Sequence, residues 1–194
     1  DASAAGPARG ADYFGARLAT VEQHPTNAAA ATTCTAQHGL PGPWHERLPH
    51  FRAEFSPGTG EELQSEYFVP RQHARATLRA IAELQARIAP LLKAAEIRTI
   101  AADNLWLSTC YGADRVAFHF TWAHDWPGVG TVLPLIEARI APFGARPHWG
   151  KLFTQDPTDI RSLYAKLPDF VALARELDPV GKFRNAFLDR YIFG

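Results

Sequence analysis

Residues 141–151, with the sequence APFGARPHWGK, carry the side chains best suited to chemistry. They combine a histidine, a tryptophan and a lysine with two glycines and two prolines. Glycine and proline set the backbone path, so we expect His148 and Lys151 to have defined directions. Such a segment is typical of a site that holds a cofactor or a substrate. Most single lysines are exposed surface residues, however, and most single histidines are structural.

A second polar group lies on two segments that alternate like β-strands. Glu96 and Arg98 are two residues apart on one segment, and His119 and Thr121 on the next. Residues two apart in a strand share a face, so in a hairpin these four side chains would meet. Mixed donors and acceptors suit a polyhydroxylated ligand, because each hydroxyl both donates and accepts. From the pattern alone we prefer the plainer interpretation, the solvated face of an antiparallel sheet.

Other functional motifs are absent from the sequence. His119, His124 and Asp125 match no standard metal-site spacing, so no metal is expected. The patterns GxGxxG, GxxxxGK, GxSxG and CxxC do not occur. Without a phosphate-binding loop, the chain is not expected to hold a dinucleotide by itself.

Composition limits the class of protein. The 194 residues suffice for one sizeable domain, or one plus an appendage, and 46% are hydrophobic, enough for a core. Basic and acidic residues number 20 each, which argues against binding nucleic acid or an anionic membrane through charge. We expect no membrane span and no signal peptide. Cys34 and Cys110 are far apart, which indicates two thiols in the cytoplasm, although one disulfide would also fit.

Hydrophobic periodicity predicts an α+β fold. Alternating residues predict strands over residues 63–69, 95–101, 115–122 and 143–149. Residues 105–108 either continue the second strand or pair with it. Helical spacing predicts helices over residues 72–92 and around 132–140. The order β-α-β-β-α-β is the split βαβ pattern, an antiparallel sheet with helices on one face.

The third predicted strand has two different faces. Val116, Phe118, Phe120 and Trp122 are apolar, and they alternate with Ala117, His119 and Thr121. We therefore expect the first set to face the core and His119 and Thr121 to face the open side.

The flanking regions are less regular. Residues 1–43 are rich in Ala, Gly, Pro and Thr and predict a partly irregular lead-in, followed by a strand around residues 50–55. After residue 151 we expect a short helical tail, with helices from Pro157 to about Lys166, over 168–177 and over 184–191. The sequence contains no methionine and begins with Asp1, so we expect it to be the back part of a longer protein.

Several stretches, in the same order, resemble the alditol oxidase group of the vanillyl-alcohol-oxidase-type flavoproteins, near the sugar-1,4-lactone oxidases. They are residues 34–37, 41–44, 47–51, 64–71, 96–99, 119–122, 146–151 and 181–185. The His-Trp-Gly-Lys stretch at 148–151 is the most specific. Together these stretches cover most of the chain from about residue 20 onward.

The resemblance implies a division of the chain and roles for its residues. Residues 44–150 would form the cap, or substrate-binding, domain, and 151–194 a C-terminal return that packs on an FAD domain absent from this sequence. That domain would carry FAD covalently on a histidine. Glu96, Arg98, Thr121 and Lys151 would contact a polyol, and His148 the flavin. Arg98 and Lys151 would be the catalytic pair, stabilising alkoxide character as hydride leaves.

The expected function is oxidation of the terminal hydroxyl of alditols such as xylitol or sorbitol to an aldehyde, with reduction of O2 to H2O2. A sugar-1,4-lactone oxidase or dehydrogenase is the first alternative, and a non-catalytic binding module is the second. The expected partners are a small polyol, O2 and the N-terminal FAD-binding part of the same protein. Neither nucleic acid nor membrane is expected, and the complete protein is expected to be a monomer.

Overall fold

A computed structural model describes residues 19–24, 31–47 and 61–194 of the chain. Two units are distinguished, Asp1–Gly60 and Glu61–Gly194. In the first, short 3₁₀ turns occur at Ala31–Thr33 and Trp44–Glu46, and the Arg47 guanidinium donates to the Leu40 and Pro41 carbonyls at 2.7 and 3.0 Å. The strand predicted around residues 50–55 lies outside the described residues.

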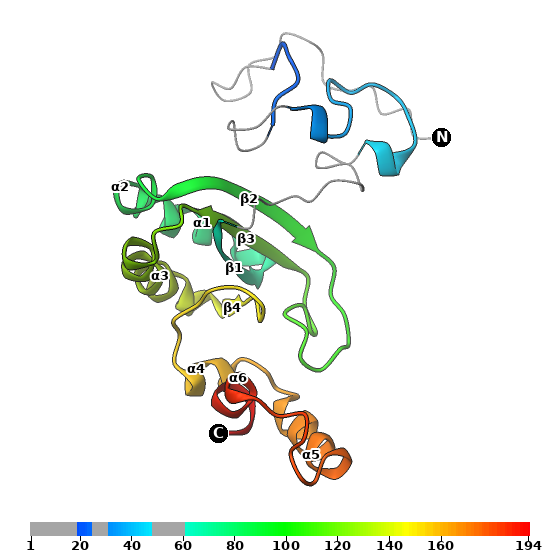
Figure 1. Ribbon diagram of the computed structural model, residues 1–194, viewed down its shortest axis with the longest axis vertical. Coiled ribbons are helices and arrows are strands. Elements are labelled where there is room, and N and C mark those ends of the chain that lie inside the picture. Colours follow the sequence, from blue (N-terminus) through cyan, green and yellow to red (C-terminus); the bar gives the residue numbers. More distant parts are fainter. Residues whose placement is uncertain (1–18, 25–30, 48–60) are drawn as a thin grey trace. The chain divides into compact units, whose positions relative to one another are not determined.

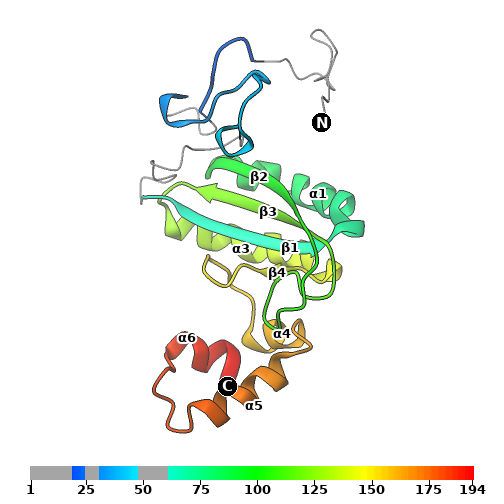
Figure 2. The same cartoon turned by 90° about the vertical axis from the view of Figure 1, so that its right-hand side faces the viewer.

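The second unit is built on a four-stranded antiparallel sheet. Its strands are β1 (Leu63–Pro70), β2 (Leu92–Ile100), β3 (Arg115–Trp122) and β4 (Arg146–Pro147), in the order β2-β3-β1-β4. Helices α1 (Ala74–Ala82), α2 (Gln85–Ile88) and α3 (Trp126–Ile140) lie on one side of it (Figures 1 and 2). The predicted β-α-β-β-α-β order and the α+β class are confirmed.

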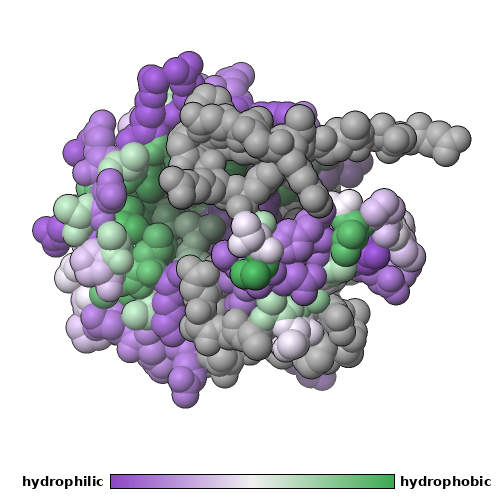
Figure 3. All heavy atoms as spheres, turned by 90° about the horizontal axis from the view of Figure 1, so that it is seen from above, coloured by the Kyte–Doolittle hydropathy of each residue, from purple (hydrophilic) through white to green (hydrophobic). Residues whose placement is uncertain are grey.

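The core lies between this sheet and the helices. Every second residue of β3 is buried there, as the alternation predicts: Val116, Phe118, Phe120 and Trp122. They pack with Tyr67 and Val69 of β1 and with apolar residues of α3, namely Val129, Val132, Leu133, Ile136 and Ile140. Burial of each large side chain contributes about 1.5–3 kcal/mol. In the left part of the face seen in Figure 3, hydrophobic residues gather and hydrophilic residues border them.

Several predicted elements are wrong in their extent. The helix predicted over residues 72–92 is divided into α1 and α2 and ends at Ile88, because Pro90 cannot continue it. The strand predicted over 143–149 is only the two-residue β4. A 3₁₀ turn occupies Ala141–Phe143, and Gly144 ends it with a positive φ of 65°.

The residues between β2 and β3 form a loop. Residues 105–108, predicted to extend or pair with the second strand, are not in a strand, and the loop is closed by a bridge between Asp103 and Tyr111. Its carbonyls are bound by Arg146, which donates to Ser108, Thr109 and Tyr111 at 3.2–3.4 Å. A buried guanidinium needs such acceptors, so Arg146 fixes the loop to the start of the segment that carries Lys151.

The C-terminal tail contains the expected short helices, α4 (Pro157–Ser162), α5 (Leu167–Leu177) and α6 (Ala186–Leu188), followed by a π-helix at Asp189–Phe193. Asp156 caps α4 by accepting from the Thr158 N–H at 2.7 Å, and Pro157 is its first residue. The first of these helices ends at Ser162, earlier than the predicted Lys166. Among the described helices, none has both the length and the apolar character needed to cross a membrane.

A buried network ties the tail to the sheet. Glu137 of α3 accepts hydrogen bonds from the Tyr67 hydroxyl and from the Thr154 N–H, both at 2.8 Å. Burial raises the pKa of Glu137, and burial together with the neighbouring Glu137 carboxylate raises that of Tyr67. Thr154 lies three residues after Lys151, so this network fixes one end of the segment that carries the lysine.

The two faces of β3 give a first prediction. Phe120→Ala should lower the free energy of unfolding by roughly 3–5 kcal/mol, because it removes a buried ring that stacks on Trp122 at 5.2 Å and leaves a cavity. Thr121→Val on the opposite face keeps β-branching and should cost only roughly 0.5–1.5 kcal/mol. Urea denaturation measures both. A larger loss for Thr121→Val than for Phe120→Ala would mean that the two faces are reversed.

Candidate active site

The register of the sheet gathers the polar residues in one row. His119 lies opposite Glu66 of β1 and also opposite Glu96 of β2. Residues directly opposite each other in antiparallel strands point to the same face. Glu66, His119 and Glu96 therefore line up across three strands on the face that the helices leave open.

Arg98 joins the two carboxylates of this row. Its NH2 group donates to Glu96 Oε2 at 2.6 Å, and its NH1 group donates to Glu66 Oε1 at 2.9 Å. Charge-assisted contacts of this kind hold a guanidinium in a fixed plane. The prediction that Glu96 and Arg98 share a face is confirmed.

Lys151 reaches the same row from the segment after β4. Its ammonium donates to Glu66 Oε2 and lies 2.9 Å from His119 Nδ1. The backbone around it is held by two hydrogen bonds, from the Lys151 N–H to the His148 carbonyl at 3.1 Å and from the Leu152 N–H to the Gln64 carbonyl at 2.9 Å. The lysine is thus placed on the sheet although it belongs to no strand.

Thr121 is connected to the cluster through His119, whose Nε2 lies 3.2 Å from the threonine hydroxyl. The structure therefore brings together Glu96, Arg98, Thr121 and Lys151. The resemblance predicts these four as substrate contacts, and in the structure they are linked by Glu66 and His119. Their roles toward a substrate remain predictions.

His148 lies beside this cluster. Its ring is stacked near Phe68, with 6.1 Å between centroids, and its Nδ1 accepts the Gly150 N–H at 3.0 Å. Burial lowers the pKa of His148, and the positive charge of Lys151 lowers it further. Both effects favour a neutral imidazole. Because Nδ1 accepts the Gly150 N–H, the proton is on Nε2, which is then a hydrogen-bond donor.

Glu66 is the residue of this cluster that the sequence analysis did not single out. It lies in the stretch 64–71 that carried part of the resemblance, but no role was assigned to it. The alternation of β1 contained a signal. Leu63, Ser65, Tyr67 and Val69 face the core, which leaves Glu66 on the open face. Its partners could not be found that way, because they depend on the pairing of β1 with β3.

The charge of Glu66 is set by its neighbours. Burial alone would raise its pKa, but the neighbouring His119 ring, the hydrogen bond from Lys151 and the charges of Lys151 and Arg98 lower it from 4.5 to about 2. The carboxylate is therefore ionised at neutral pH. The negative charges of Glu66 and Glu96 together balance the positive charges of Arg98 and Lys151.

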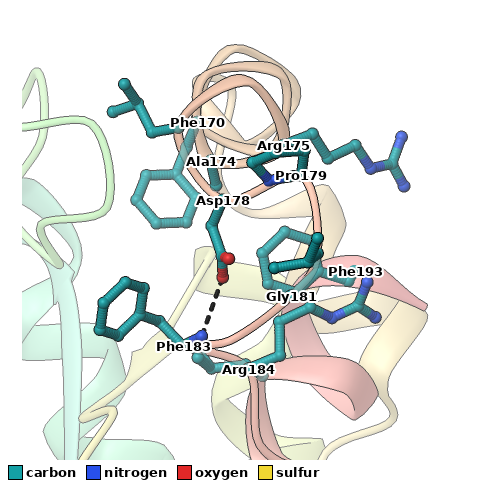
Figure 4. Close-up of a pocket in the computed structure, with 12 residues that line it drawn as sticks. Phe170, Ala174, Arg175, Asp178, Pro179, Gly181, Phe183, Arg184 and Phe193 are labelled. Atoms are coloured by element: carbon teal, nitrogen blue, oxygen red, sulfur yellow. Dashed lines mark hydrogen bonds between the residues drawn. The ribbon is translucent and has the colours of Figure 1, made fainter.

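A cavity of about 610 Å³ lies elsewhere, between α5 and the turn that follows it (Figure 4). Asp178 in its lining accepts the Lys182 and Phe183 N–H groups at 2.8 Å each. Arg184 pairs with Asp189 at 2.6 Å and lies over the Phe193 ring. These polar groups are already used within the tail, so we assign chemistry to the sheet cluster. Among the described residues, no group of three His, Cys, Asp or Glu side chains could hold a metal ion.

Comparison with known proteins gives a consistent result. A family model described as D-arabinono-1,4-lactone oxidase matches residues 61–191. The chain is 52% identical over 177 residues to an alditol oxidase from Streptomyces sp., covering 91% of this chain and 43% of that protein.

More distant relatives act, by their names, on lactones. The chain is 30% identical over 132 residues to an L-gulono-1,4-lactone dehydrogenase from Mycobacterium tuberculosis, covering 66% of this chain and 30% of that protein. It is 27% identical over 137 residues to an L-gulonolactone oxidase from Bos taurus, covering 66% of this chain and 30% of that protein. The chain thus spans less than half the length of these relatives.

The lowered pKa of Glu66 predicts a dependence of stability on pH. The folded-state pKa lies below the unfolded value, so the stabilisation is complete above about pH 4.5 and is lost as the pH falls toward 2. The free energy of unfolding of the wild type should therefore exceed that of Glu66→Gln by roughly 3 kcal/mol at pH 6, and this difference should shrink as the pH falls. Urea denaturation at a series of pH values measures it.

Glu83→Gln is the matched control, since Glu83 pairs with Arg139 on the surface, where both side chains are more than half exposed. Such pairs contribute little. A difference between wild type and Glu66→Gln that stays constant from pH 6 to pH 3 would contradict the assignment.

Proposed function

The chain belongs to the D-arabinono-1,4-lactone oxidase family, and on that premise we propose that it is the substrate-binding part of an FAD-dependent alditol oxidase. The reaction would convert a terminal hydroxyl to an aldehyde. The observation that carries the proposal is the pair of cations, Arg98 and Lys151, held by carboxylates on an open sheet face. The 52% identity to an alditol oxidase, against 30% to a lactone dehydrogenase, favours the alditol.

The residues present fit a flavin. Lys151 and Arg98 provide positive charge, and His148 is a neutral donor beside them. A cation near a flavin stabilises its reduced, anionic form. When bound, FAD would accept hydride from the substrate carbon and pass two electrons to O2, which gives H2O2. We propose that it is attached covalently to a histidine of an N-terminal domain, and that His148 contacts it.

Arg98 and Lys151 would bind the oxygen of the reacting hydroxyl. That oxygen would gain negative charge as its proton leaves to solvent, and preorganised cations would stabilise this charge without rearranging until hydride leaves the carbon and the C=O bond forms. Both cations are ordered before a ligand arrives, because Glu66 contacts both of them. We therefore propose that they are the catalytic residues.

Glu96 and Thr121 would bind the neighbouring hydroxyls. The Glu96 carboxylate accepts only from Arg98 among the side-chain contacts of the described residues, so lone pairs are left for hydroxyl donors. The Thr121 hydroxyl both donates and accepts, which matches a polyol. A chain of hydroxyls would thus lie along the row of strands.

The strongest alternative is oxidation of a sugar-1,4-lactone, supported by the name of the family model and by the more distant relatives. A non-catalytic binding module is the alternative from another class, and a stoichiometric yellow chromophore in the complete protein would exclude it. We further propose a monomer located in the cytoplasm, where the buried Cys110 would stay a thiol.

Substrate choice is the direct test. The complete, flavin-loaded protein should release H2O2 with xylitol or sorbitol, and do so faster than with L-gulono-1,4-lactone, because a cluster of mixed donors and acceptors matches a chain of free hydroxyls. Peroxide release is measured in air and flavin reduction without oxygen. Faster reduction by the lactone would assign the protein to the alternative, and rapid reduction with no peroxide would make it a dehydrogenase.

Removal of either cation should slow the chemical step. Arg98→Ala and Lys151→Ala should each lower the rate of flavin reduction by polyol about 10²–10³-fold, while flavin content stays unchanged. Stopped-flow absorbance of the flavin measures the rate. Lys166→Ala is the control, since Lys166 pairs with Asp169 in the tail. Near-normal reduction in both cation variants would refute the catalytic assignment.

A further inference from the structure

The Glu66 carboxylate binds both cations of the site, Arg98 and Lys151. Arg98 donates to one of its oxygens at 2.9 Å, and Lys151 donates to the other. The Glu66 side chain is only 4% exposed, whereas those of Arg98, Glu96 and Lys151 are 41%, 32% and 17% exposed. A ligand on the open face can therefore reach the cations, while the Glu66 carboxylate is covered by them.

We propose that Glu66 is the positioning residue of the site, which directs Lys151 and Arg98 toward the substrate without contacting the substrate itself. The inference rests on the proposed function for the identity of the substrate. The arrangement of the three side chains does not depend on that function.

The contacts of Lys151 set the direction of a hydrogen-bond chain. An ammonium has three N–H donors and no acceptor. One donor goes to Glu66 and one to His119 Nδ1 at 2.9 Å, which leaves the third for a ligand. Because Lys151 can only donate, His119 Nδ1 must accept. The longer distance of 3.4 Å between that nitrogen and Glu66 Oε2 is outside the usual hydrogen-bond range.

The proton of His119 is then on Nε2, which donates to the Thr121 hydroxyl at 3.2 Å. With its oxygen engaged as acceptor, Thr121 has its own O–H available to donate to a ligand oxygen. Glu66 thus acts on Thr121 through Lys151 and His119. Removing the charge of Glu66 would therefore change the hydrogen bonding of the Thr121 hydroxyl, although Glu66 does not contact Thr121.

The charge balance of the cluster also indicates that the position of Lys151 depends on Glu66. The groups that face one another are Glu66 of β1, Glu96 and Arg98 of β2, His119 of β3, and His148 and Lys151 of the segment after β4. With neutral histidines, two carboxylates balance two cations. In Glu66→Gln, only Glu96 would remain, and it contacts Arg98 rather than Lys151. Lys151 would lose its anionic partner.

The reactivity of the Lys151 amine tests this without any catalysis. The complete protein is treated with N-acetoxysuccinimide, and acetylation of Lys93, Lys151, Lys166 and Lys182 is followed by peptide mass spectrometry. Glu66→Gln should speed acetylation of Lys151 at least about tenfold, the protection expected from one charge-assisted hydrogen bond. The other three lysines should be unchanged.

Glu96→Gln is the matched control, because it removes a carboxylate of the same row that does not touch Lys151. Its Lys151 should react at the wild-type rate. An unchanged Lys151 rate in Glu66→Gln, or a rise shared by all four lysines, would overturn the positioning role.

A double-mutant cycle tests the link to function. Glu66→Gln should slow flavin reduction by polyol about 10–100-fold, since displaced catalytic groups lose rate steeply. In the Lys151→Ala background, Glu66→Gln should slow flavin reduction by much less than this factor, because the effects of residues that act through one another are not additive. Full additivity would refute the inference. If polyol does not reduce the wild-type flavin at all, the proposed function fails, while the acetylation result still decides the role of Glu66.

Discussion

The pairing of β3 with both β1 and β2 is the interaction on which the core and the candidate site both depend. In this register Phe120 lies opposite Ser65 and Ala95 on the helix-covered face, while the preceding residue, His119, lies between Glu66 and Glu96 on the open face. A slip of one residue would move every side chain of the strand to the other face. The buried face, with Phe118, Phe120 and Trp122, makes such a slip very unfavourable. The core therefore fixes the geometry of the polar face.

The open face concentrates charge, and this has a physical requirement. A carboxylate as buried as Glu66 is stable only when it is paired. Arg98 and Lys151 provide that pairing, and they are in turn held in place by it. A site of this kind is ordered before ligand binds, which is the condition for electrostatic stabilisation of a developing charge. Stability and proposed catalysis thus use the same contacts.

Lys151 shows how distant parts of the chain contribute. It follows β4, 85 residues after Glu66, yet it lies on the same row. The segment around it is fixed by contacts with two other elements, the loop between β2 and β3 and helix α3. Trp149 donates to the Leu107 carbonyl at 2.9 Å, Arg146 binds the loop between β2 and β3, and Thr154 binds Glu137 of α3. These contacts explain why a loop can position a charged group as firmly as a strand does.

The sequence by itself determined the two faces of the strands, the order of elements and the cap of α4, because these follow from periodicity and from local backbone chemistry. It also indicated Glu96, Arg98, Thr121 and Lys151 through a resemblance. Tertiary structure decided the partners of Glu66 and the link through His119. It also decided the two-residue length of β4. These features depend on which strands pair, in what register, and where the chain returns, and such long-range contacts leave no periodic signal in the sequence.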